Sequence, residues 1–519
     1  MIVTSIDRAD PTRRSPVTDT VSKRLAARGF RVPAVPDGAR RRLDRARRLL
    51  EHPRAPLLAL ALIVALSFGA RAIDLAQPCK APCATPAEHT LIFDEAFYVN
   101  AARAIDAVHQ PAGSPYHGSP AGKDPNAEHA QLAKLVIGGG IELFGDDPWG
   151  WRAGSVLFGL IAILALYALV RGAGGSQWLG VDAAGVMALD NLALVHGRIA
   201  TLDIYAMSLM LVAGALFVRR RPLLAGVALG FGACTKVVAF YLLAALVLFE
   251  AVRLAWAWRD ARTARRAAAE SDPDEEPADA AEGDTAAEGD TAEGKRGVAG
   301  RPLAWRSECK PIIVCIAATA VVFFGLLWVM DLLVPAWDPG SHTVYGGSPF
   351  THFAHMVSFA KGLKTSPHSH GIASTPLQWL VDQKPIDYAR VNVNKLVGGR
   401  TISSRATIDF RGEINPFIIF VALPALVAAG AAIWRSRDRV ALVGASWTLG
   451  TYAPFVAQSL ITHRISYLFY MLIVMPGIYV LAARLFSPRY VPRLATIVWV
   501  ALLVYGFARL YPIRTLLFG

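Results

Sequence analysis

The sequence has few charged residues and few cysteines, and each shortage excludes a class of protein. Charged residues make up 18% of the 519 residues, whereas hydrophobic residues make up 54% and the mean hydropathy is +0.38. Disordered and collagen-like chains do not have so large an apolar fraction, and 5 cysteines are too few for a disulfide scaffold. A soluble protein could not hide this much apolar surface, so the composition indicates a membrane protein that crosses the bilayer several times.

The net charge of +13 does not indicate nucleic-acid binding. Residues 1–54 hold 14 Lys/Arg and 6 Asp/Glu and come directly before the first apolar run, where basic residues retain a chain end in the cytoplasm. The segment lacks the interleaved aromatic platform of single-strand binders, and it is too long for the basic region of a signal peptide. We interpret 1–54 as a basic cytoplasmic tail and expect no nucleic-acid partner.

Long apolar runs predict an all-α polytopic fold, because a membrane-spanning helix needs about 20 mostly apolar residues. Eleven spans are expected, at 56–75, 153–170, 178–195, 204–218, 223–234, 237–254, 311–334, 416–434, 440–458, 465–485 and 494–510. The run at 135–144 is short and contains three glycines, so it predicts a juxtamembrane helix that does not cross. Arginines cluster in the connections that then face the cytoplasm, which favours an N-terminus inside and a C-terminus outside the cell membrane.

The spans divide the chain into two membrane modules, 55–254 and 311–519. Each module has one large outer loop, at 76–152 and 335–415, and both loops contain Trp, Tyr, His and paired charges. We therefore expect the functional site at the outer face of the membrane.

The segment between the modules, 255–310, has a different composition. Its acidic run at 270–293 contains 11 Asp/Glu in Ala/Gly-rich repeats and is flanked by arginines. Low complexity without aromatic residues predicts a disordered cytoplasmic loop.

Cys79 and Cys83 open the first outer loop, in what would be an oxidising compartment. They could form a disulfide or remain free thiols. A metal site is the weakest alternative, because two ligands at this spacing specify little.

The first outer loop also contains the segment LIFDEAFYVNAARAI at 91–105. Its apolar residues recur at helical spacing, which predicts an amphipathic helix that lies on the membrane. Asp94 and Glu95 stand at its start, where the helix dipole stabilises negative charge. Capping of the helix would explain these two residues as well as catalysis would, so the choice depends on the polar residues elsewhere.

Further charged clusters fall at the expected outer ends of the spans. They contain Glu128, His129, Lys134, Arg198, Asp203, Lys236, His463 and Arg464. Ionisable residues at membrane depth are costly and commonly mark a site or an ion pair, although each alone could anchor a helix at the interface. Several clusters on one face predict a polar cavity that binds an anionic headgroup.

A family resemblance rests on the order of these motifs. The sequence reads FDEAFY, then EHAQLAK before LFGDDPWGWR, then GRIATLDIY and GACTKV, and later STPLQWLVDQKPIDY and THRISYLFYMLIVMPGIYVL. This order resembles the GT-C class of integral-membrane glycosyltransferases, in particular protein O-mannosyltransferases of glycosyltransferase family 39 and their lipid A aminoarabinose-transferase relatives. The resemblance covers about 57–485, most of the chain outside the basic tail and the acidic loop.

The resemblance implies transfer of a sugar, with mannose as the expected sugar, from a polyprenyl-phosphate donor to Ser/Thr of secreted or membrane proteins at the outer face. Asp94 matches the acidic position of the family and would be the general base, with Glu95 beside it as a second catalytic residue. The candidates for binding the donor phosphate are Lys236, Arg464, Arg198 and Lys134, in that order. Asp203 would orient one of these cations. A single displacement that inverts the anomeric centre needs only one carboxylate.

A divalent cation is left open as a cofactor. Glu128 matches a glutamate that is associated with metal in the aminoarabinose relatives, and His129 follows it. The second outer loop adds His342, His352, His355, His368 and His370, which we interpret as loop histidines without a metal role.

Two departures from the family pattern concern the parts that contact donor and acceptor. His129-Ala130-Gln131-Leu132 replaces the usual His-Pro-Pro-Leu, and Pro376-Leu377 stand where mannosyltransferases tend to have an aromatic residue. The sugar and the acceptor are therefore the least secure expectations. A GT-C enzyme that modifies a lipid or a cell-wall glycan with another sugar is the first alternative, and a polyprenyl-lipid transporter or flippase is the second. The sequence lacks the matched halves that are common in transporters.

Overall fold

The computed structural model of the chain describes residues 51–80, 82–270, 305–364, 371–397, 400–487 and 490–515. The chain divides into two compact units, Met1–Leu58 and Ala59–Gly519, and only residues 51–58 of the first are described. The predicted basic tail therefore lies almost entirely outside the described residues, as does the acidic run except for its first residue.

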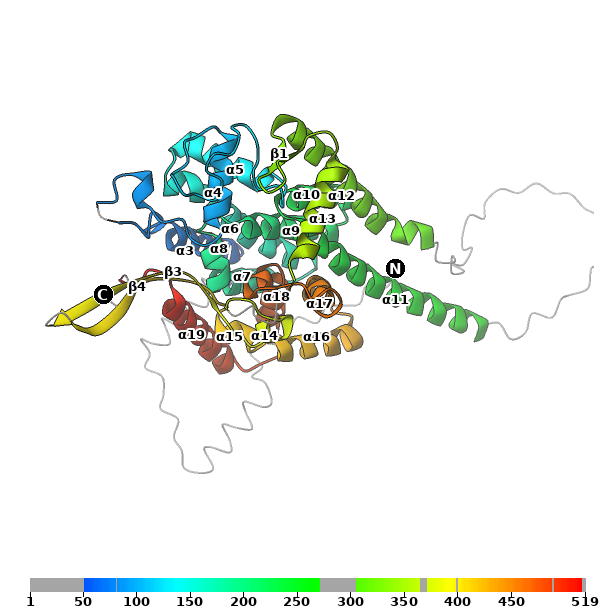
Figure 1. Cartoon of the computed structure of the whole chain (residues 1–519). Helices are drawn as coiled ribbons and strands as arrows, with labels where there is room; N and C mark the ends of the chain where they lie inside the picture. Colours follow the sequence, from blue (N-terminus) through cyan, green and yellow to red (C-terminus); the bar gives the residue numbers. More distant parts are fainter. Residues whose placement is uncertain are drawn as a thin grey trace, which may run out of the picture. The chain divides into compact units, whose positions relative to one another are not determined.

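The described residues are mostly helical (Figure 1). The helical elements are α3 (Ala55–Ala72), η1 (Pro86–Glu88), α4 (Glu95–Ile105), α5 (Leu132–Phe144), α6 (Pro148–Gly172), α7 (Gln177–Ala188), α8 (Asn191–His196), α9 (Leu202–Val218), α10 (Pro222–Thr235), η2 (Val237–Phe240), α11 (Tyr241–Glu270), α12 (Trp305–Leu333), α13 (Pro349–Gly362), α14 (Pro376–Trp379), α15 (Pro416–Ile419), α16 (Ala422–Ser436), α17 (Arg439–Ile461), η3 (Leu468–Ile473), α18 (Met475–Leu485) and α19 (Arg493–Leu510). The strands are β1 (Ala336–Asp338), β2 (Thr343–Tyr345), β3 (Ile386–Val397) and β4 (Arg400–Gly412).

Seven helices in the described part of the chain are long and apolar enough to cross a membrane. They are Ala55–Ala72, Pro148–Gly172, Val237–Ala267, Glu308–Leu333, Pro416–Ser436, Arg439–Ile461 and Arg493–Leu510. Three shorter apolar helices, α9, α10 and α18, fall within further expected spans. The polytopic helical class is confirmed, whereas the number of eleven crossings stays a prediction.

The expected spans at 178–195 and 465–485 are among those that are divided into two helical elements. The span at 178–195 is interrupted between α7 and α8, where the Asp190 carboxylate accepts hydrogen bonds from the Asn415 backbone N–H (2.8 Å) and the Tyr479 hydroxyl (2.6 Å). The span at 465–485 consists of η3 and α18, and Pro476 stands in the first turn of α18. Proline has no N–H to donate, so the start of a helix suits it better than the middle.

The predicted loop between the modules is shorter than expected. Helix α11 continues to Glu270, and α12 already begins at Trp305. Only residues 271–304 lie outside the described residues here, and the disorder predicted for them stays a prediction.

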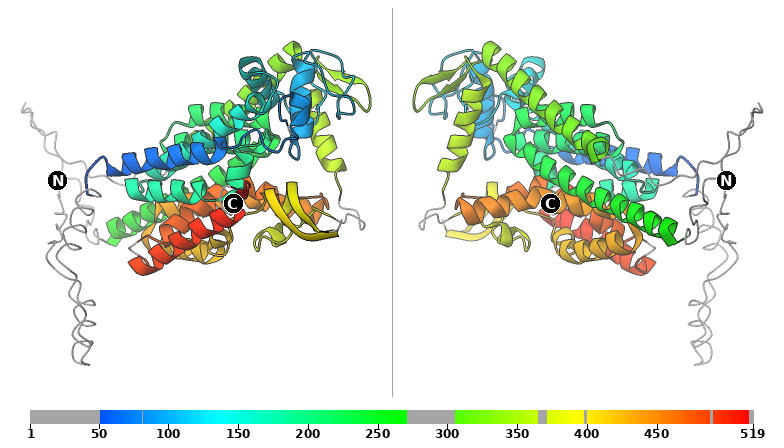
Figure 2. Two further views of the ribbon diagram at one scale, coloured as in Figure 1. Left: turned by 90° about the vertical axis from the view of Figure 1, so that its left-hand side faces the viewer. Right: turned by 90° about the vertical axis from the view of Figure 1, so that its right-hand side faces the viewer.

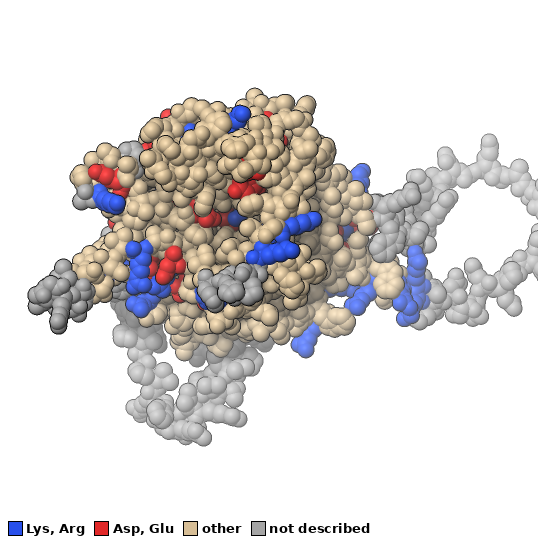
Figure 3. Space-filling view, viewed as in Figure 1, with Lys and Arg blue, Asp and Glu red and all other residues tan. Residues whose placement is uncertain are grey.

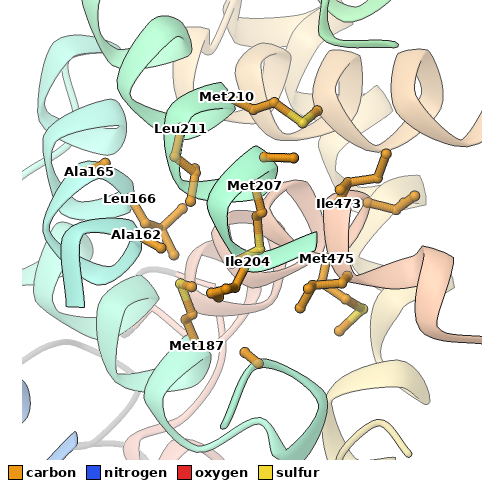
Figure 4. Packing of buried hydrophobic residues seen from close by; sticks show 14 of the residues in the cluster. Ala162, Ala165, Leu166, Met187, Ile204, Met207, Met210, Leu211, Ile473 and Met475 are labelled. Atoms are coloured by element: carbon orange, nitrogen blue, oxygen red, sulfur yellow. The ribbon is translucent and has the colours of Figure 1, made fainter. Parts of the chain in front are cut away.

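Helices α6 and α9 pack against each other through small and flexible apolar side chains (Figure 4). Ala162 and Leu166 of α6 and Met207 of α9 are fully buried, and Met475 at the start of α18 lies in the same cluster. Small residues let helix backbones approach closely, and methionines fill irregular gaps. This core therefore joins α6 and α9 to the start of α18.

Two antiparallel strand pairs were not anticipated by the all-α prediction. Strands β1 and β2 form one short pair, and β3 and β4 form a long hairpin with register shifts along its length. The hairpin projects from the helices in Figure 1, and the left view of Figure 2 looks toward it from its outer end. Its base, at Ile386 and Tyr388, is buried against the helical core.

Candidate functional site

Charged side chains are confined to a few places on the face of the molecule seen in Figure 3, and most of that face is uncharged. A cavity of about 390 Å³ contains several of the charged residues that the sequence singled out. Its lining consists of Asp94, Tyr98, Glu128, His129, Lys236, Val237, Val238, Phe240, Tyr241, Phe353, Met356, Val357, Phe359, Ala360, Lys361, Leu363, Gln458, Thr462, Arg464, Tyr467, Phe469 and Tyr470. Acidic, basic and apolar groups from both modules therefore meet in one space.

Asp94 is the N-cap residue of α4, but its side chain does not cap the helix. Its backbone carbonyl accepts hydrogen bonds from the N–H groups of Phe97 (3.0 Å) and Tyr98 (3.1 Å). The carboxylate makes no hydrogen bond to any residue that the structure describes, and it lines the cavity. Capping, the alternative explanation for this carboxylate, therefore does not apply.

The environment of Asp94 favours proton uptake. Burial raises the pKa of the Asp94 carboxyl to about 6, while the charge of Lys236 opposes this rise and that of Asp203 adds to it. A carboxyl with a pKa near neutrality can accept a proton and release it again at physiological pH.

Glu95 has a different position from that of its neighbour Asp94, because its side chain does not line the cavity. Its side chain is fully buried, and Oε2 lies 2.7 Å from Arg152 Nη2. Oε1 accepts from Arg152 Nε and from the Ala200 backbone N–H, both at 2.8 Å, and Oε2 also accepts from the Ile92 backbone N–H at 2.7 Å. With both oxygens occupied and the side chain outside the cavity lining, Glu95 joins α4 to α6 and to the segment before α9.

Lys236 and Asp203 form a buried ion pair at the edge of the cavity. Lys236 Nζ lies 2.8 and 2.9 Å from the two Asp203 oxygens. The same ammonium group lies 5.4 Å from the centre of the Phe469 ring and 5.7 Å from that of Tyr470. Asp203 therefore fixes the direction of this cation, as the sequence predicts for one of the basic residues.

Arg464 lies in the cavity lining, after the end of α17. Its Nη1 donates to Gln458 Oε1 at 3.3 Å, and its Nε is buried with no partner among the described residues. A planar guanidinium with free donors is well suited to bind a phosphate through two oxygens.

Arg198 and Lys134 do not line the cavity that holds the other two candidates for phosphate binding, Lys236 and Arg464. Arg198 donates to the backbone carbonyls of Ala70, Ile73 and Asp74 and thereby caps the end of α3. Lys134 is fully buried. Its Nζ pairs with Asp124 and donates to the carbonyls of Asn126 (2.7 Å) and His129 (2.8 Å).

Glu128 and His129 line the cavity beside Asp94. Glu128 Oε2 accepts from Asn126 Nδ2 at 3.1 Å, and burial raises the pKa of the Glu128 carboxyl despite this hydrogen bond. Burial, with the nearby cations Lys236, Lys134 and Arg464, holds the pKa of His129 well below its usual value, so its ring is neutral.

The residues described contain no group of three His, Cys, Asp or Glu side chains that could hold a metal ion. His352 bonds instead to Asp331 and to the Ala127 carbonyl, and His355 bonds to Tyr345. His342 packs near Trp337, whereas His368 and His370 lie outside the described residues.

Cys79 and Cys83 form a disulfide, which decides between the alternatives that the sequence left open. Cys234, Cys309 and Cys315 are free thiols.

Sequence reasoning missed the aromatic and apolar parts of the cavity. Tyr467, Phe469 and Tyr470 lie within or beside η3, inside an expected span, where aromatic residues carry no separate signal. Helix α13 provides an apolar wall that includes Phe353 and Met356. The sequence analysis gave no helix range within the loop at 335–415, so α13 was not predicted.

The fold is that of the GT-C class of membrane glycosyltransferases. It is similar to the structure of the S. cerevisiae protein O-mannosyltransferase Pmt1-Pmt2 complex bound to the sugar donor, with a TM-score of 0.56 and 12% identity over 88% of this chain and 90% of that chain. A weaker likeness, to ArnT from Cupriavidus metallidurans bound to undecaprenyl phosphate, has a TM-score of 0.43 and 16% identity over 84% and 61% of the two chains.

Sequence comparison points to one family within this class. Residues 128–264 match the family model described as dolichyl-phosphate-mannose-protein mannosyltransferase. A polyprenol-phosphate-mannose–protein mannosyltransferase of Corynebacterium glutamicum is 38% identical over 78 residues, which is 15% of this chain and 15% of that protein. The resemblance inferred from the motifs is thus confirmed, and the curated match spans only a small part of either protein.

Proposed function

We propose that this chain transfers mannose from a polyprenyl-phosphate donor to Ser or Thr side chains of proteins at the outer face of the cell membrane. The observation that carries the proposal is the meeting of three groups in one cavity. The carboxylate of Asp94 has no hydrogen-bond partner among the described residues, Lys236 and Arg464 provide positive charge, and α13 provides an apolar wall. The family match over residues 128–264 supports mannose as the sugar.

The donor would bind with its phosphate at Lys236 and Arg464 and with the first part of its lipid along the apolar wall. The ammonium of Lys236 keeps its direction through Asp203, and Arg464 has an unpartnered Nε to offer. Apolar residues along this wall include Val357 and Phe359. A ligand with an anionic head and an apolar tail matches such a cavity better than a free sugar nucleotide does.

The reaction is a single displacement. Asp94 takes the proton of the acceptor hydroxyl as its oxygen attacks the anomeric carbon of mannose. The bond between that carbon and the donor phosphate oxygen breaks, and the polyprenyl phosphate leaves with the negative charge. Lys236 and Arg464 stabilise this developing charge. One carboxylate is sufficient, and the sugar inverts at the anomeric carbon.

Reconstitution in liposomes tests the proposal. Purified protein, radiolabelled polyprenyl-phosphate mannose and a Ser/Thr/Pro-rich peptide are expected to give a labelled glycopeptide. Asp94→Asn is expected to abolish the product. Asp387→Asn changes a carboxylate of the outer hairpin that is 57% exposed and outside the cavity lining, so it is the matched control with unchanged activity. Label in a lipid or glycan but not in peptide would instead support the alternative GT-C activity.

The phosphate site has its own variant. Arg464→Gln removes the guanidinium and is expected to lower kcat/KM for the donor by about 10- to 100-fold, the scale of a lost charge-assisted hydrogen bond. Arg435→Gln, at an exposed position in the last turn of α16, is the control. Equal donor kinetics in the two variants would remove Arg464 from the site.

A further inference from the structure

Four rings pack together between Asp94 and Lys236. Phe93, which directly precedes Asp94, stacks on Tyr388 with ring centres 4.3 Å apart and meets the edge of Phe469 at 5.5 Å. Phe469 in turn lies 5.4 Å from Lys236 Nζ. His196 completes the group, 5.6 Å from Tyr388 and 5.9 Å from Phe469.

Hydrogen bonds fix the two inner rings of this group. The Nδ1 atom of His196 is 2.8 Å from Thr201 Oγ1, and its Nε2 atom is 2.9 Å from the Tyr388 hydroxyl. His196 is fully buried, so neither ring nitrogen has water as an alternative partner. The backbone of Gly412 packs directly against the Tyr388 ring, because a Cβ added at Gly412 would overlap the Tyr388 hydroxyl and ring.

The backbone at Phe93 depends on this packing. Phe93 has a φ of +54°, in the left-handed region that bulky residues rarely adopt. Such a conformation persists only where the surroundings hold it in place. The stacked Tyr388 ring keeps the Phe93 side chain, and with it the Phe93 backbone, in this conformation. The backbone conformation at Phe93 in turn sets the direction of the chain at Asp94.

We propose that His196 and Tyr388 are positioning residues that hold the Asp94 carboxylate in place through Phe93. Neither His196 nor Tyr388 lines the cavity, so both act on the reaction only through the residues they contact. Tyr388 belongs to β3 in the second module, whereas His196 and Asp94 belong to the first. The hairpin base therefore supports the segment that carries Asp94 from a distant part of the chain. This inference rests on the proposed function, in which Asp94 is the general base.

Conservative variants test the inference. Tyr388→Phe keeps the ring but removes the hydroxyl, and His196→Phe keeps a ring of similar size but removes the partner of that hydroxyl. Each is expected to lower kcat by about tenfold, the scale of one lost hydrogen bond, while KM for the polyprenyl-phosphate donor stays within about twofold. The double variant is expected to be no slower than the slower single variant, because both changes remove the same hydrogen bond.

Tyr205→Phe is the matched control. Tyr205 is a fully buried tyrosine whose hydroxyl accepts a hydrogen bond from Ser155 Oγ at 3.2 Å, and it does not line the cavity. It is expected to change thermal stability by a similar amount to Tyr388→Phe and to leave kcat unchanged. A purely structural role for Tyr388 would give the two variants the same kinetics.

The outcomes separate this inference from the proposed function. No mannosyl transfer by the wild-type protein would overturn the proposed function itself. An active wild type with full kcat in Tyr388→Phe and His196→Phe would overturn the positioning role alone, as would singles whose losses multiply in the double variant. A rise in donor KM at unchanged kcat would assign the two residues to donor binding and would also overturn it.

Discussion

The ammonium group of Lys236 lies 2.8 Å from one carboxylate oxygen of Asp203 and 2.9 Å from the other, and both residues are buried. Removing one member of a buried ion pair leaves the other charge without compensation, at a cost of about 3–5 kcal/mol. Asp203→Asn is therefore expected to lower the Tm of the detergent-solubilised protein clearly. The double variant Lys236→Met/Asp203→Leu is expected to regain most of that Tm and to remain inactive.

This pair of variants distinguishes stability from function. A double variant that is both stable and active would show that the donor phosphate does not need Lys236. A double variant as unstable as Asp203→Asn would show that the ion pair itself, and not an unpaired charge, sets the stability of this region.

The pH dependence of transfer follows from the environment of Asp94. Burial raises the pKa of its carboxyl to about 6, with Lys236 opposing the rise and Asp203 adding to it. A general base acts only in its ionised form, so kcat/KM is expected to increase with pH up to about 6 and to be level above it. Lys236→Met removes the opposing charge, so the increase in any residual activity is expected at higher pH. An increase centred near the ordinary aspartate pKa of about 3.9 would contradict the burial of this group.

The same pKa has a consequence for stability. An aspartate whose folded-state pKa is raised binds its proton more tightly in the folded than in the unfolded protein. Its contribution to stability is therefore lost as the pH increases from the ordinary value through about 6. Asp94→Asn is thus expected to have a Tm at pH about 8 no lower than that of the wild type, although it is inactive. A marked fall in Tm would show that this carboxylate supports the fold.

Glu95 is expected to behave in the opposite way. Glu95→Gln breaks its ion pair with Arg152 and leaves the guanidinium buried without a charged partner. The loss of a buried pair costs about 3–5 kcal/mol, so the yield of folded protein and its Tm are expected to fall. The kcat of the remaining folded fraction, measured by active-site titration with labelled donor, is expected to be near that of the wild type. A stable variant without activity would restore Glu95 as a catalytic residue.

The cysteines offer a test of the orientation in the membrane. Cys79 and Cys83 form a disulfide in the loop at 76–152, which is expected to lie outside, whereas Cys309 is partly exposed near the start of α12. In intact cells, a membrane-impermeant maleimide is expected to label the first two only after reduction, and Cys309 only after the membrane is opened. Cys234 and Cys315 are buried and are expected to stay unlabelled in the folded protein. Labelling of Cys309 in intact cells would reverse the orientation.

The sequence drew attention to Lys236, Asp203 and Arg464 because each is ionisable near an apolar span, and to Asp94 because of its motif. Asp94, Lys236 and Arg464 line one cavity and Asp203 pairs with Lys236, whereas the roles of these four residues stay predictions. Arg198 stood in the same kind of context, yet it binds backbone carbonyls at the end of α3. Which partner a buried cation meets depends on tertiary packing, and spacing along the chain does not contain that information.

The sequence also does not show which of two adjacent carboxylates enters the cavity. Asp94 and Glu95 are consecutive at the start of α4, and Asp94 lines the cavity whereas Glu95 pairs with Arg152. The hairpin of β3 and β4 escaped prediction for another reason. Residues 391–394 of β3 are exposed on both faces, and register shifts interrupt the alternation of polar and apolar residues that would identify strands.

Asn415 of the expected second module forms hydrogen bonds to residues of the expected first module, and these bonds do not involve the segment between the modules. Its backbone N–H donates to Asp190, and its side-chain amide donates to the carbonyls of Leu189 and Leu503, both at 2.9 Å. A polypeptide cleaved within 271–304 would therefore keep its halves associated through these interior contacts. The two pieces could be produced from separate genes and combined, so that isotopes or fluorophores are placed in one piece alone.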